Sequence, residues 1–503
     1  MSVAYAVAGV FVAWLLYIFF PAVKSRQWFA HQLNGPPSPS FLTGRFFIDF
    51  WQKDHAPHMG HVQRYGKIFK YPFALGIPMI FIADPYIVSD VYSHPDTYKK
   101  TKGMITMLDN LFGRGLLSAD DDFHKQLRRI IAPAFTPSVI RSLFSEFLEE
   151  AYRLQGRLQD KVKENTEVDM LNELSRTTLD IFGTTGLGQD QLGDPLNRLG
   201  QAYTSLIGAL TADMGKFGML QVIITQLQII PSAMMRMIKT SRAIIESKGK
   251  QMIAQAGQKR DKDLLSLLVK SNSNESASKQ LSEQQIIEQI TTILFAGHET
   301  VSTSLSWTLY HLADNPSLQT RLHDELSELP EEPTFEQLDA CPLLGKVVRE
   351  ILRVYPPVPS TQRELAVDLE IPLSEPVTLK DGRVITSLPL KKGEVLNLSV
   401  ICANRDKDVW GSDAEEFNPD RFDRPNTPAK QIPSAWGNVL SFSHGSRNCI
   451  GFRFALAEMK ALLFVIMRNW RVERVCPVEH RNGITSRPYV DNKPSCPLRL
   501  HAL

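Results

Sequence analysis

Cys449, near the C-terminus, has a residue type and neighbours that could support metal chemistry. It lies in a stretch from Phe442 to Gly451 that reads Phe-Ser-His-Gly-Ser-Arg-Asn-Cys-Ile-Gly, directly before a run with helical character over 452–465. The start of a helix and the charge of Arg447 both favour the ionised form of a thiol. Cys449 is therefore a candidate metal ligand, and the alternative is a small buried hydrophobic residue.

The other residues of this stretch favour the metal ligand. Gly445 and Gly451 allow the backbone to approach a flat ligand closely, because glycine has no Cβ. Arg447 and His444 supply positive charge that a cysteine in an apolar core would not need. These residues therefore favour a cysteine that binds a metal beside a flat ligand over a small buried hydrophobic residue.

The five fixed positions of the pattern are Phe442, Gly445, Arg447, Cys449 and Gly451, and they resemble the haem-binding loop of the cytochrome P450 family. The resemblance implies that Cys449 is the axial ligand of the iron in haem b, with Phe442, Arg447 and Gly451 in the cofactor-binding loop. Ligation by a cysteine thiolate increases electron density at the iron and favours cleavage of the O–O bond. The remaining sequence can be tested for the parts that such a site requires.

Composition excludes several other classes of protein. A chain of 503 residues with 43% hydrophobic residues can bury a large core, and a net charge of +2 gives no indication of nucleic-acid binding. The five cysteines form no Cys-x-x-Cys pair, so the sequence indicates neither a zinc site nor a disulfide framework. This pattern is typical of a reducing compartment.

The N-terminus predicts a membrane anchor. Residues 1–23 carry no charged side chain, and about 20 apolar residues are enough to cross a bilayer as a helix. Lys24 and Arg26 follow directly, which favours a cytoplasmic position for the remaining chain. A cleaved signal peptide is the alternative, but the segment lacks basic residues at its start. We expect an anchor over 1–23, a Pro-rich linker over 24–40 and a catalytic domain over 41–503.

A helix is predicted to begin near Asp120, where acidic residues precede basic ones. His124 and Arg128 are four residues apart and share one face of it. A solvated charged face is the alternative. The resemblance implies that Arg128, His124 and Arg447 bind haem propionates, with Arg363 as a further candidate. The family commonly has tryptophan where this chain has His124, and either residue offers an N–H donor.

A long helix is predicted from Ser282, which forms a capping-box pattern with Gln285, to about Pro316. Its length of roughly 45 to 50 Å, at 1.5 Å per residue, requires it to cross the middle of a large domain. Near its centre, Gly297 costs about 1 kcal/mol relative to alanine. Either close packing against another helix or an opening for a ligand would explain this glycine.

Glu299 and Thr300 follow this glycine directly. They resemble the acid-alcohol pair of the cytochrome P450 family. The resemblance implies that the threonine hydroxyl orients protons and water at the oxygen site and that the acid relays the protons. The two residues are therefore the candidate catalytic residues of this chain.

A third group of residues is expected to support the cysteine loop. Glu350 and Arg353 are three residues apart on a helix predicted over 343–355 and therefore face the same side. Arg421 lies in a Phe-Asn-Pro-Asp-Arg-Phe segment that resembles the family segment whose arginine joins the Glu-x-x-Arg pair. The resemblance implies a structural triad of Glu350, Arg353 and Arg421.

Taken together, these motifs predict a mainly α-helical cytochrome P450 fold with a small β-rich region, preceded by one transmembrane helix. The implied reaction is monooxygenation, with electrons from NADPH through a separate NADPH-cytochrome P450 reductase and with cytochrome b5 as a further partner. No Gly-x-Gly-x-x-Gly fingerprint for a nucleotide is present in the chain itself. A P450-fold isomerase or dehydratase and a non-catalytic haem sensor are the alternatives. The bases near the loop that we expect to dock the reductase are His444, Arg447, Arg453 and Lys460.

The substrate is expected to be lipophilic. The segment 201–240 is rich in Leu, Ile and Met, and the resemblance implies that it covers the substrate pocket beside the membrane. The Gly-His-Glu-Thr centre of the long helix resembles P450s of mushroom-forming fungi, many of which modify terpenoids in secondary metabolism. We therefore expect a terpenoid, with sterols, fatty acids or xenobiotics as alternatives, and an endoplasmic reticulum membrane location with the catalytic domain facing the cytoplasm.

Overall fold

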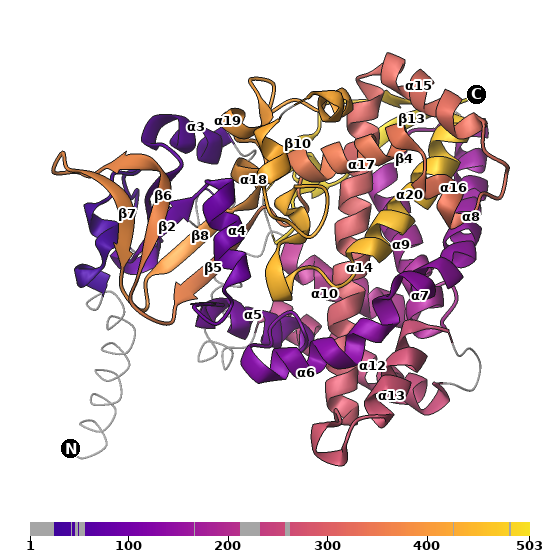
Figure 1. Cartoon of the computed structure of the whole chain (residues 1–503). Coiled ribbons are helices and arrows are strands. Elements are labelled where there is room, and N and C mark those ends of the chain that lie inside the picture. Colours follow the sequence, from indigo (N-terminus) through magenta and orange to yellow (C-terminus); the bar gives the residue numbers. More distant parts are fainter. Residues whose placement is uncertain are drawn as a thin grey trace.

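A helical part and a smaller β-rich part make up the protein (Figure 1). The computed structural model describes residues 25–41, 43–45, 49, 56–164, 166–211, 232–256, 262–425, 427–481 and 484–503. The predicted anchor over 1–23 and much of the apolar segment 201–240 lie outside these residues. No helix within the described ranges is both long enough and apolar enough to span a bilayer.

Helices make up more than half of the described residues. They are α3 (Ala56–Tyr65), α4 (Pro85–Ser93), α5 (Lys102–Phe112), α6 (Asp121–Ile131), α7 (Pro137–Ser142), α8 (Phe144–Lys163), α9 (Met170–Leu187), α10 (Arg198–Thr211), α12 (Ala233–Gln255), α13 (Leu264–Ser273), α14 (Glu283–Ala313), α15 (Pro316–Ser327), α16 (Phe335–Asp339), α17 (Pro342–Val354), α18 (Val400–Ala403), α19 (Lys407–Trp410) and α20 (Phe452–Asn469). Short 3-10 turns connect several of them, including Leu440–Phe442 and Gly445–Arg447 beside the cysteine.

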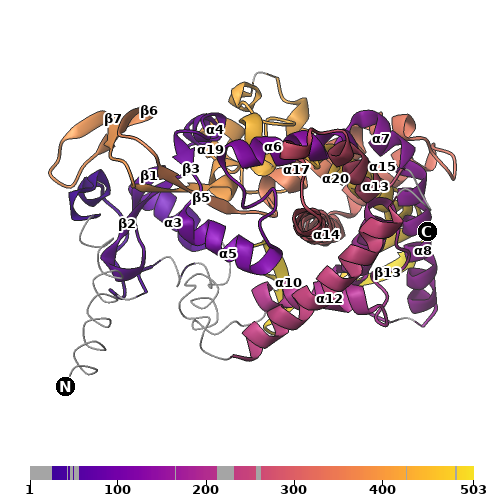
Figure 2. The ribbon, with the colours of Figure 1, turned by 90° about the horizontal axis from the view of Figure 1, so that it is seen from below.

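The long helix α14 crosses the middle of the helical part, where Figure 2 shows it end-on. The predicted capping box is confirmed, since the Ser282 side chain accepts from the Gln285 backbone and the Gln285 side chain accepts from the Ser282 backbone. Most of the side chains of α14 are buried, as expected for a helix surrounded by other helices. The helix ends at Ala313, close to the predicted end before Pro316.

Aromatic contacts join the helices around α14. Phe454 of α20 packs edge-on against Phe147 of α8, with ring centroids 4.7 Å apart, and lies 5.7 Å from the ring of Phe182 in α9. Aromatic rings at such separations add specificity to apolar packing. Since α20 begins three residues after Cys449, this packing fixes the helix that follows the cysteine loop.

The β-rich part is dominated by one five-stranded sheet in the order β1-β2-β8-β5-β3. The strands of the protein are β1 (Ile68–Pro72), β2 (Pro78–Ile82), β3 (Tyr98–Lys99), β4 (Val168–Asp169), β5 (Ser360–Leu365), β6 (Leu369–Thr378), β7 (Val384–Leu390), β8 (Val395–Ser399), β9 (Trp470–Arg474), β10 (Glu479–Arg481), β11 (Arg487–Val490), β12 (Lys493–Pro494) and β13 (Pro497–Ala502). β1 and β2 form a hairpin, in which they pair antiparallel with Ile68 opposite Ile82. The mainly helical architecture with a small β-rich region is confirmed.

Part of the segment predicted as a linker packs into the β-rich part. Leu33 is fully buried and forms a β-bridge with Leu379, and the Phe29 N–H donates to the carboxylate of Glu394 at 2.6 Å. This part of the 24–40 segment is therefore fixed to the domain and is not a free spacer. The domain boundaries themselves remain predictions.

Candidate active site

The cysteine loop closes on itself through its backbone. The Cys449 N–H donates to the carbonyl of Phe442 at 2.9 Å, which joins the two ends of the loop. Gly445 has a φ of 71°, and a Cβ there would lie 2.7 Å from the carbonyl oxygen of Tyr92 in α4. Backbone packing and conformation therefore require glycine at position 445. Close approach to a flat ligand is not needed to explain this glycine. A Cβ on Gly451 would meet only the Phe135 ring, at 3.5 Å.

The Cys449 side chain is solvent-accessible although it is surrounded by protein. Burial raises the pKa of its thiol, and the backbone hydrogen bond from Gly451 and the charge of Arg128 lower it by less. The expectation that the loop alone favours a thiolate is therefore wrong, because burial outweighs these two effects. A bound metal would have to displace the proton. Cys341, Cys402 and Cys496 are buried and Cys476 is only partly exposed, so Cys449 is the most accessible of the five cysteines.

Arg128 and His124 project from α6 on the side of the cysteine loop. Arg128 donates to the backbone carbonyl of Asn448 at 2.7 Å and also to the Asn448 side chain. His124 is only 6% exposed, and burial, followed by the nearby charges of Arg447 and Lys100, lowers its pKa to about 3. His124 is therefore a neutral side chain that can still donate one N–H group.

Lys100 lies near His124 and Arg447, and no motif in the sequence predicts this position. Its ammonium donates to the Ala119 carbonyl at 2.8 Å. Burial, and then the charges of Arg447 and Arg363, lower the pKa of Lys100 to about 7. Arg447 also forms an ion pair with Asp120. Lys100, His124, Arg128, Arg363 and Arg447 form what we call the basic cluster.

Arg363 approaches the basic cluster from β5. It lies over the ring of Tyr92, 5.5 Å from the centroid, and burial lowers its pKa. Its guanidinium donates to the carbonyl of Gln362 at 2.7 Å, and Arg447, Asp120 and Lys100 are the charged groups near it. Three separate segments of the chain thus bring positive charge together beside the cysteine loop.

The segment after α5 connects the cysteine loop to α14. A Cβ on Gly115 would lie 1.9 Å from the hydroxyl of Thr292, so only glycine permits this approach to α14. Next to it, the Leu116 N–H donates to the Gln289 side chain at 2.8 Å. A few residues later, the Ala119 carbonyl accepts from Lys100 and Arg447 of the basic cluster.

One turn of α14 is open to solvent where the helix crosses the core. Ala296 is exposed and Thr300 is partly exposed, although most side chains on either side of this turn are buried. The Thr300 hydroxyl donates to the Ala296 carbonyl at 2.7 Å. A Cβ on Gly297 would lie 2.6 Å from the Phe182 ring, so close packing against α9 explains this glycine.

Glu299 points away from this open turn toward the C-terminal strands. Its side chain is 1% exposed, forms an ion pair with Arg487 of β11 and accepts from the Thr485 hydroxyl at 2.7 Å. Neither Arg487 nor Thr485 was predicted, because they are almost 190 residues away and belong to no recognisable motif. Glu299 and Thr300 are thus neighbours on the helix, and their side chains bond to different partners.

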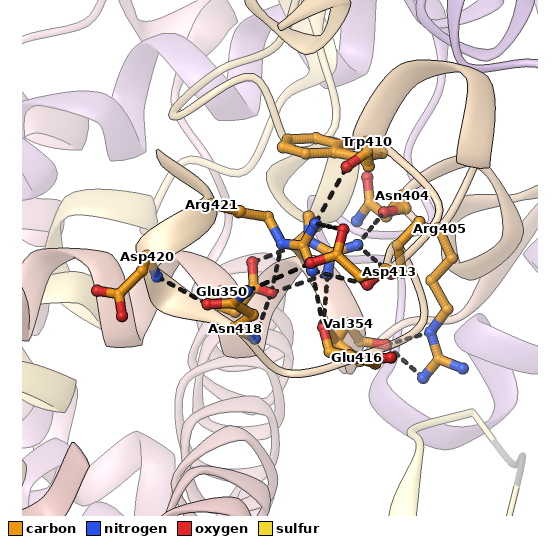
Figure 3. A network of polar contacts seen from close by, with 12 residues as sticks. Glu350, Val354, Asn404, Arg405, Trp410, Asp413, Glu416, Asn418, Asp420 and Arg421 are labelled. Carbon is orange, nitrogen blue, oxygen red and sulfur yellow. Dashed lines mark hydrogen bonds and ion pairs between the residues drawn. The ribbon is translucent and has the colours of Figure 1, made fainter. Parts of the chain in front are cut away.

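The predicted triad is confirmed as a buried network on the side of α17 (Figure 3). Glu350 accepts from Arg353 at 2.8 and 2.9 Å and from Arg421 at 2.7 Å. Arg421 extends to Asp413, and Asn418 donates its backbone N–H to Glu350. All three members of the triad are at most 2% exposed. Through Asn404, which accepts from Arg353 and donates to Ser441, the network reaches the cysteine loop.

Two of the bases expected to dock a reductase have other partners. Lys460 is buried and forms an ion pair with Asp339 at 2.6 Å, and Arg447 pairs with Asp120. The prediction that Lys460 and Arg447 belong to an exposed basic surface is therefore wrong. Arg453 is exposed and lies over the Phe452 ring.

The site fits a haem group. Among the described residues, no three His, Cys, Asp or Glu side chains are placed to hold a metal together, so iron at Cys449 needs a cofactor that supplies its other ligands. The basic cluster offers several donors for two carboxylates, and Asp120 is the acid that pairs with Arg447 within it. The positive groups of the basic cluster outnumber this one acid. An iron porphyrin with two propionates matches this positive charge, together with the accessible cysteine and the open turn of α14.

A mainly helical fold with an exposed cysteine beside a basic cluster matches the class of haem-thiolate proteins. The chain belongs to the cytochrome P450 family, whose profile, described as Cytochrome P450, matches residues 35–490. It is similar to cytochrome P450 monooxygenase 205 of Postia placenta, with 35% identity over 91% of this chain and 89% of the relative. It is also similar to cytochrome P450 monooxygenase claP of Ampulloclitocybe clavipes, with 29% identity over 93% of this chain and 92% of the relative. The protein is thus a cytochrome P450 monooxygenase by class.

Proposed function

We propose that this enzyme inserts one oxygen atom of O2 into a C–H or C=C bond of a terpenoid in a fungal secondary-metabolite pathway. The second oxygen atom leaves as water, and NADPH supplies two electrons through a separate membrane-bound reductase, with cytochrome b5 as a further electron donor. Oxidation of a sterol, a fatty acid or a xenobiotic is the alternative. The observation that carries the proposal is the accessible Cys449 beside the basic cluster.

The residues of the site have separate roles in this proposal. Haem iron bound through Cys449 supplies the chemistry of oxygen activation. Arg128, His124, Arg447 and Arg363 hold the propionates, together with Lys100. Phe442 packs beside Phe452 with ring centroids 6.0 Å apart, and it supports the loop from its apolar side.

Glu299 and Thr300 handle protons in the proposed mechanism. Thr300 presents its hydroxyl on the open turn of α14, where it can orient water. Glu299 is the preceding residue of the helix, and a carboxylate can accept and return a proton. In this proposal the two side chains together carry protons from solvent to the oxygen site.

Two exposed apolar side chains support a lipophilic substrate. Leu117 is 39% exposed and lies two residues before Ala119, the partner of Lys100, and Val358 is 37% exposed and lies five residues before Arg363. Small-molecule pockets are lined mainly by apolar side chains. Residues 1–23 would anchor the domain 41–503 to the endoplasmic reticulum membrane, through the 24–40 segment, with the domain in the cytoplasm.

The full chain should be tested in microsomes that contain a fungal P450 reductase. We expect the reduced, CO-bound protein to give the spectrum of thiolate-ligated haem, and a panel of terpenes to give a product only with NADPH and reductase. Product formation without the reductase would favour the isomerase or dehydratase. Ligand binding without turnover of any lipid tested would favour the sensor.

A further inference from the structure

A second group of bases lies in the β-rich part beside β6 and β7, at the opposite end of the molecule from α8 (Figure 1 and Figure 2). The segment 31–34 packs here between β1 and the end of β6. The Lys70 N–H donates to the Asn34 carbonyl at 2.8 Å, and the Lys380 N–H donates to the Gln32 carbonyl at 3.0 Å. The backbone therefore fixes Lys70 and Lys380 beside the same short segment.

The side chains of these two lysines meet. Their ammonium groups are in hydrogen-bond contact, and the Lys380 ammonium also donates to the His31 carbonyl at 2.7 Å. Burial, followed by the contact with Lys380, lowers the pKa of Lys70 to about 8. Two like charges at such a separation repel each other, so either an anion or the loss of a proton must offset the repulsion.

His31 adds a third basic group from the segment itself. Its Nε2 atom is shielded from solvent and has no hydrogen-bond partner within the described part of the chain, while its other ring nitrogen bonds to the backbone of Ser25. Burial, and then the charges of Lys70 and Lys380, lower the pKa of His31. A nearby negative charge would favour the protonated imidazole and turn Nε2 into a donor. We call His31, Lys70 and Lys380 the lysine-histidine site.

The acids around this site have other partners. Glu375 of β6 pairs with Lys67 at 2.8 Å, and Asp381, the residue after Lys380, pairs with Arg383 at 2.8 Å. Glu394, the buried acid that bonds to the preceding turn, accepts three backbone N–H groups. Among the residues that the structure describes, no carboxylate forms an ion pair with either lysine of the site. The lysine-histidine site therefore carries positive charge that the protein does not neutralise.

We propose that the lysine-histidine site binds a phosphate monoester group. A monoester has a second pKa of about 6 and carries about two negative charges near neutral pH, so it matches two ammonium groups better than a phosphodiester with one charge. Bound there, it joins the segment after residues 1–23 to β1 and to the end of β6. The headgroup of phosphatidic acid and soluble inorganic phosphate offer the same chemistry. Binding raises the pKa values of the site, so it takes up protons and weakens as pH rises above about 8.

Competitive labelling with a trace of acetic anhydride tests the proposal, because only a neutral amine reacts. The full chain is labelled over a range of pH with vesicles of phosphatidylcholine, with vesicles that also contain phosphatidic acid, or with phosphatidylcholine vesicles and inorganic phosphate at matched ionic strength. Peptide mass spectrometry measures Lys70 and Lys380 together. We expect their labelling at pH of about 8 to fall about fivefold or more, because a pKa rise of one unit removes that share of the neutral amine.

The arms of this experiment distinguish the two sources of phosphate. Protection by phosphatidic acid alone identifies the lipid headgroup, and protection by inorganic phosphate as well identifies a soluble phosphate. No protection in either arm would overturn the proposal. Vesicles with an equal fraction of phosphatidylserine, a phosphodiester lipid, measure general surface charge, and equal protection by them would also overturn it. Lys67 is the matched control residue, because it already pairs with Glu375, Asp406 and Asp408, and its labelling should not change.

Variants test the members of the site. Lys380 is exposed, so Lys380→Met leaves the core intact. Without phosphate this variant should move the labelling profile of Lys70 toward the ordinary lysine pKa of about 10.4, and it should lose the response to phosphate. His31→Gln should need about tenfold more phosphate source for the same protection. Lys391→Met, at a lysine paired with Asp368, is the control and should respond like the wild type. An undiminished response in both Lys380→Met and His31→Gln would overturn the proposal.

Discussion

Arg128 donates to the backbone carbonyl of Asn448, the residue that immediately precedes Cys449, at 2.7 Å. A second bond from the same guanidinium reaches the Asn448 side chain. The two residues are 320 positions apart, so this contact joins α6 to the cysteine loop. Arg128 therefore both orients the loop and contributes charge to the basic cluster.

Arg128→Ala should weaken both the loop and haem binding. Loss of hydrogen bonds from a charged group typically costs about 1.5 to 3 kcal/mol, and we expect the free energy of unfolding to fall by about that amount. The ratio of haem to purified protein should fall as well. The matched control is Arg129→Ala on the same helix, where Arg129 forms an exposed pair with Glu275. A change of less than about 1 kcal/mol is expected there. Equal effects of the two variants would contradict the role of Arg128.

Cys449→Ala should remove the thiolate-type spectrum of the reduced, CO-bound protein and all NADPH-driven product formation. Cys402→Ala and Cys341→Ala are the controls, since both side chains are buried. Burial raises the pKa of Cys402 to about 11, so its thiol is a weak ligand. We expect both controls to retain the spectrum and turnover. A thiolate spectrum in Cys449→Ala would show that another residue binds the iron.

Breaking the buried triad should destabilise the whole protein. Glu350→Gln leaves the guanidinium groups of Arg353 and Arg421 buried without their shared carboxylate. Removing one partner of such a buried pair costs about 3 to 5 kcal/mol. Chemical denaturation monitored by far-UV circular dichroism measures this loss. Arg321→Ala, which breaks the exposed pair with Asp420, should cost less than about 1 kcal/mol. Similar losses in both variants would contradict the supporting role of the triad.

The parts that could be predicted from sequence are those with a local signal. The capping box of Ser282 and Gln285 depends on a spacing of three residues, and so does the pairing of Glu350 with Arg353. Helical geometry fixes which residues at such spacings meet. The family resemblance then supplied the third member of the triad, Arg421, which spacing alone could not have placed.

The parts that could not be predicted depend on contacts between distant segments. Lys100 and Arg487 lie in short strands or beside them, without a motif, and only the fold brings them to Arg447 and Glu299. Sequence periodicity does not show which helix lies opposite Gly297, so it cannot distinguish close packing from an opening for a ligand. The burial of Lys460 is equally invisible in the sequence, since a lysine on a helix usually faces solvent.

Haem retention should depend on pH through Lys100. Without a bound carboxylate, burial and the charges of Arg447 and Arg363 lower its pKa to about 7, so the ammonium loses its proton near neutrality. A bound propionate raises this pKa, and by linkage the bound state is favoured as pH falls. We therefore expect the rate of haem transfer to apomyoglobin to increase with pH above about 7. Lys100→Met should flatten this dependence. Lys99→Met, at a lysine paired with Asp121, should retain the wild-type slope.

Gly297→Ala tests whether packing against α9 explains the glycine in the middle of α14. The added methyl group would lie 2.6 Å from the Phe182 ring, which itself contacts Phe454 of α20. Overpacking of this kind costs about 1 to 3 kcal/mol, more than the gain of up to about 1 kcal/mol from replacing a helical glycine. Gly345→Ala in α17 is the matched control, because nothing lies within 4 Å of a Cβ there, and it should stabilise the protein. Phe182→Leu should recover part of the stability lost in Gly297→Ala. If Gly297→Ala instead stabilised the protein but lowered turnover, the glycine would serve a ligand and not the contact with α9.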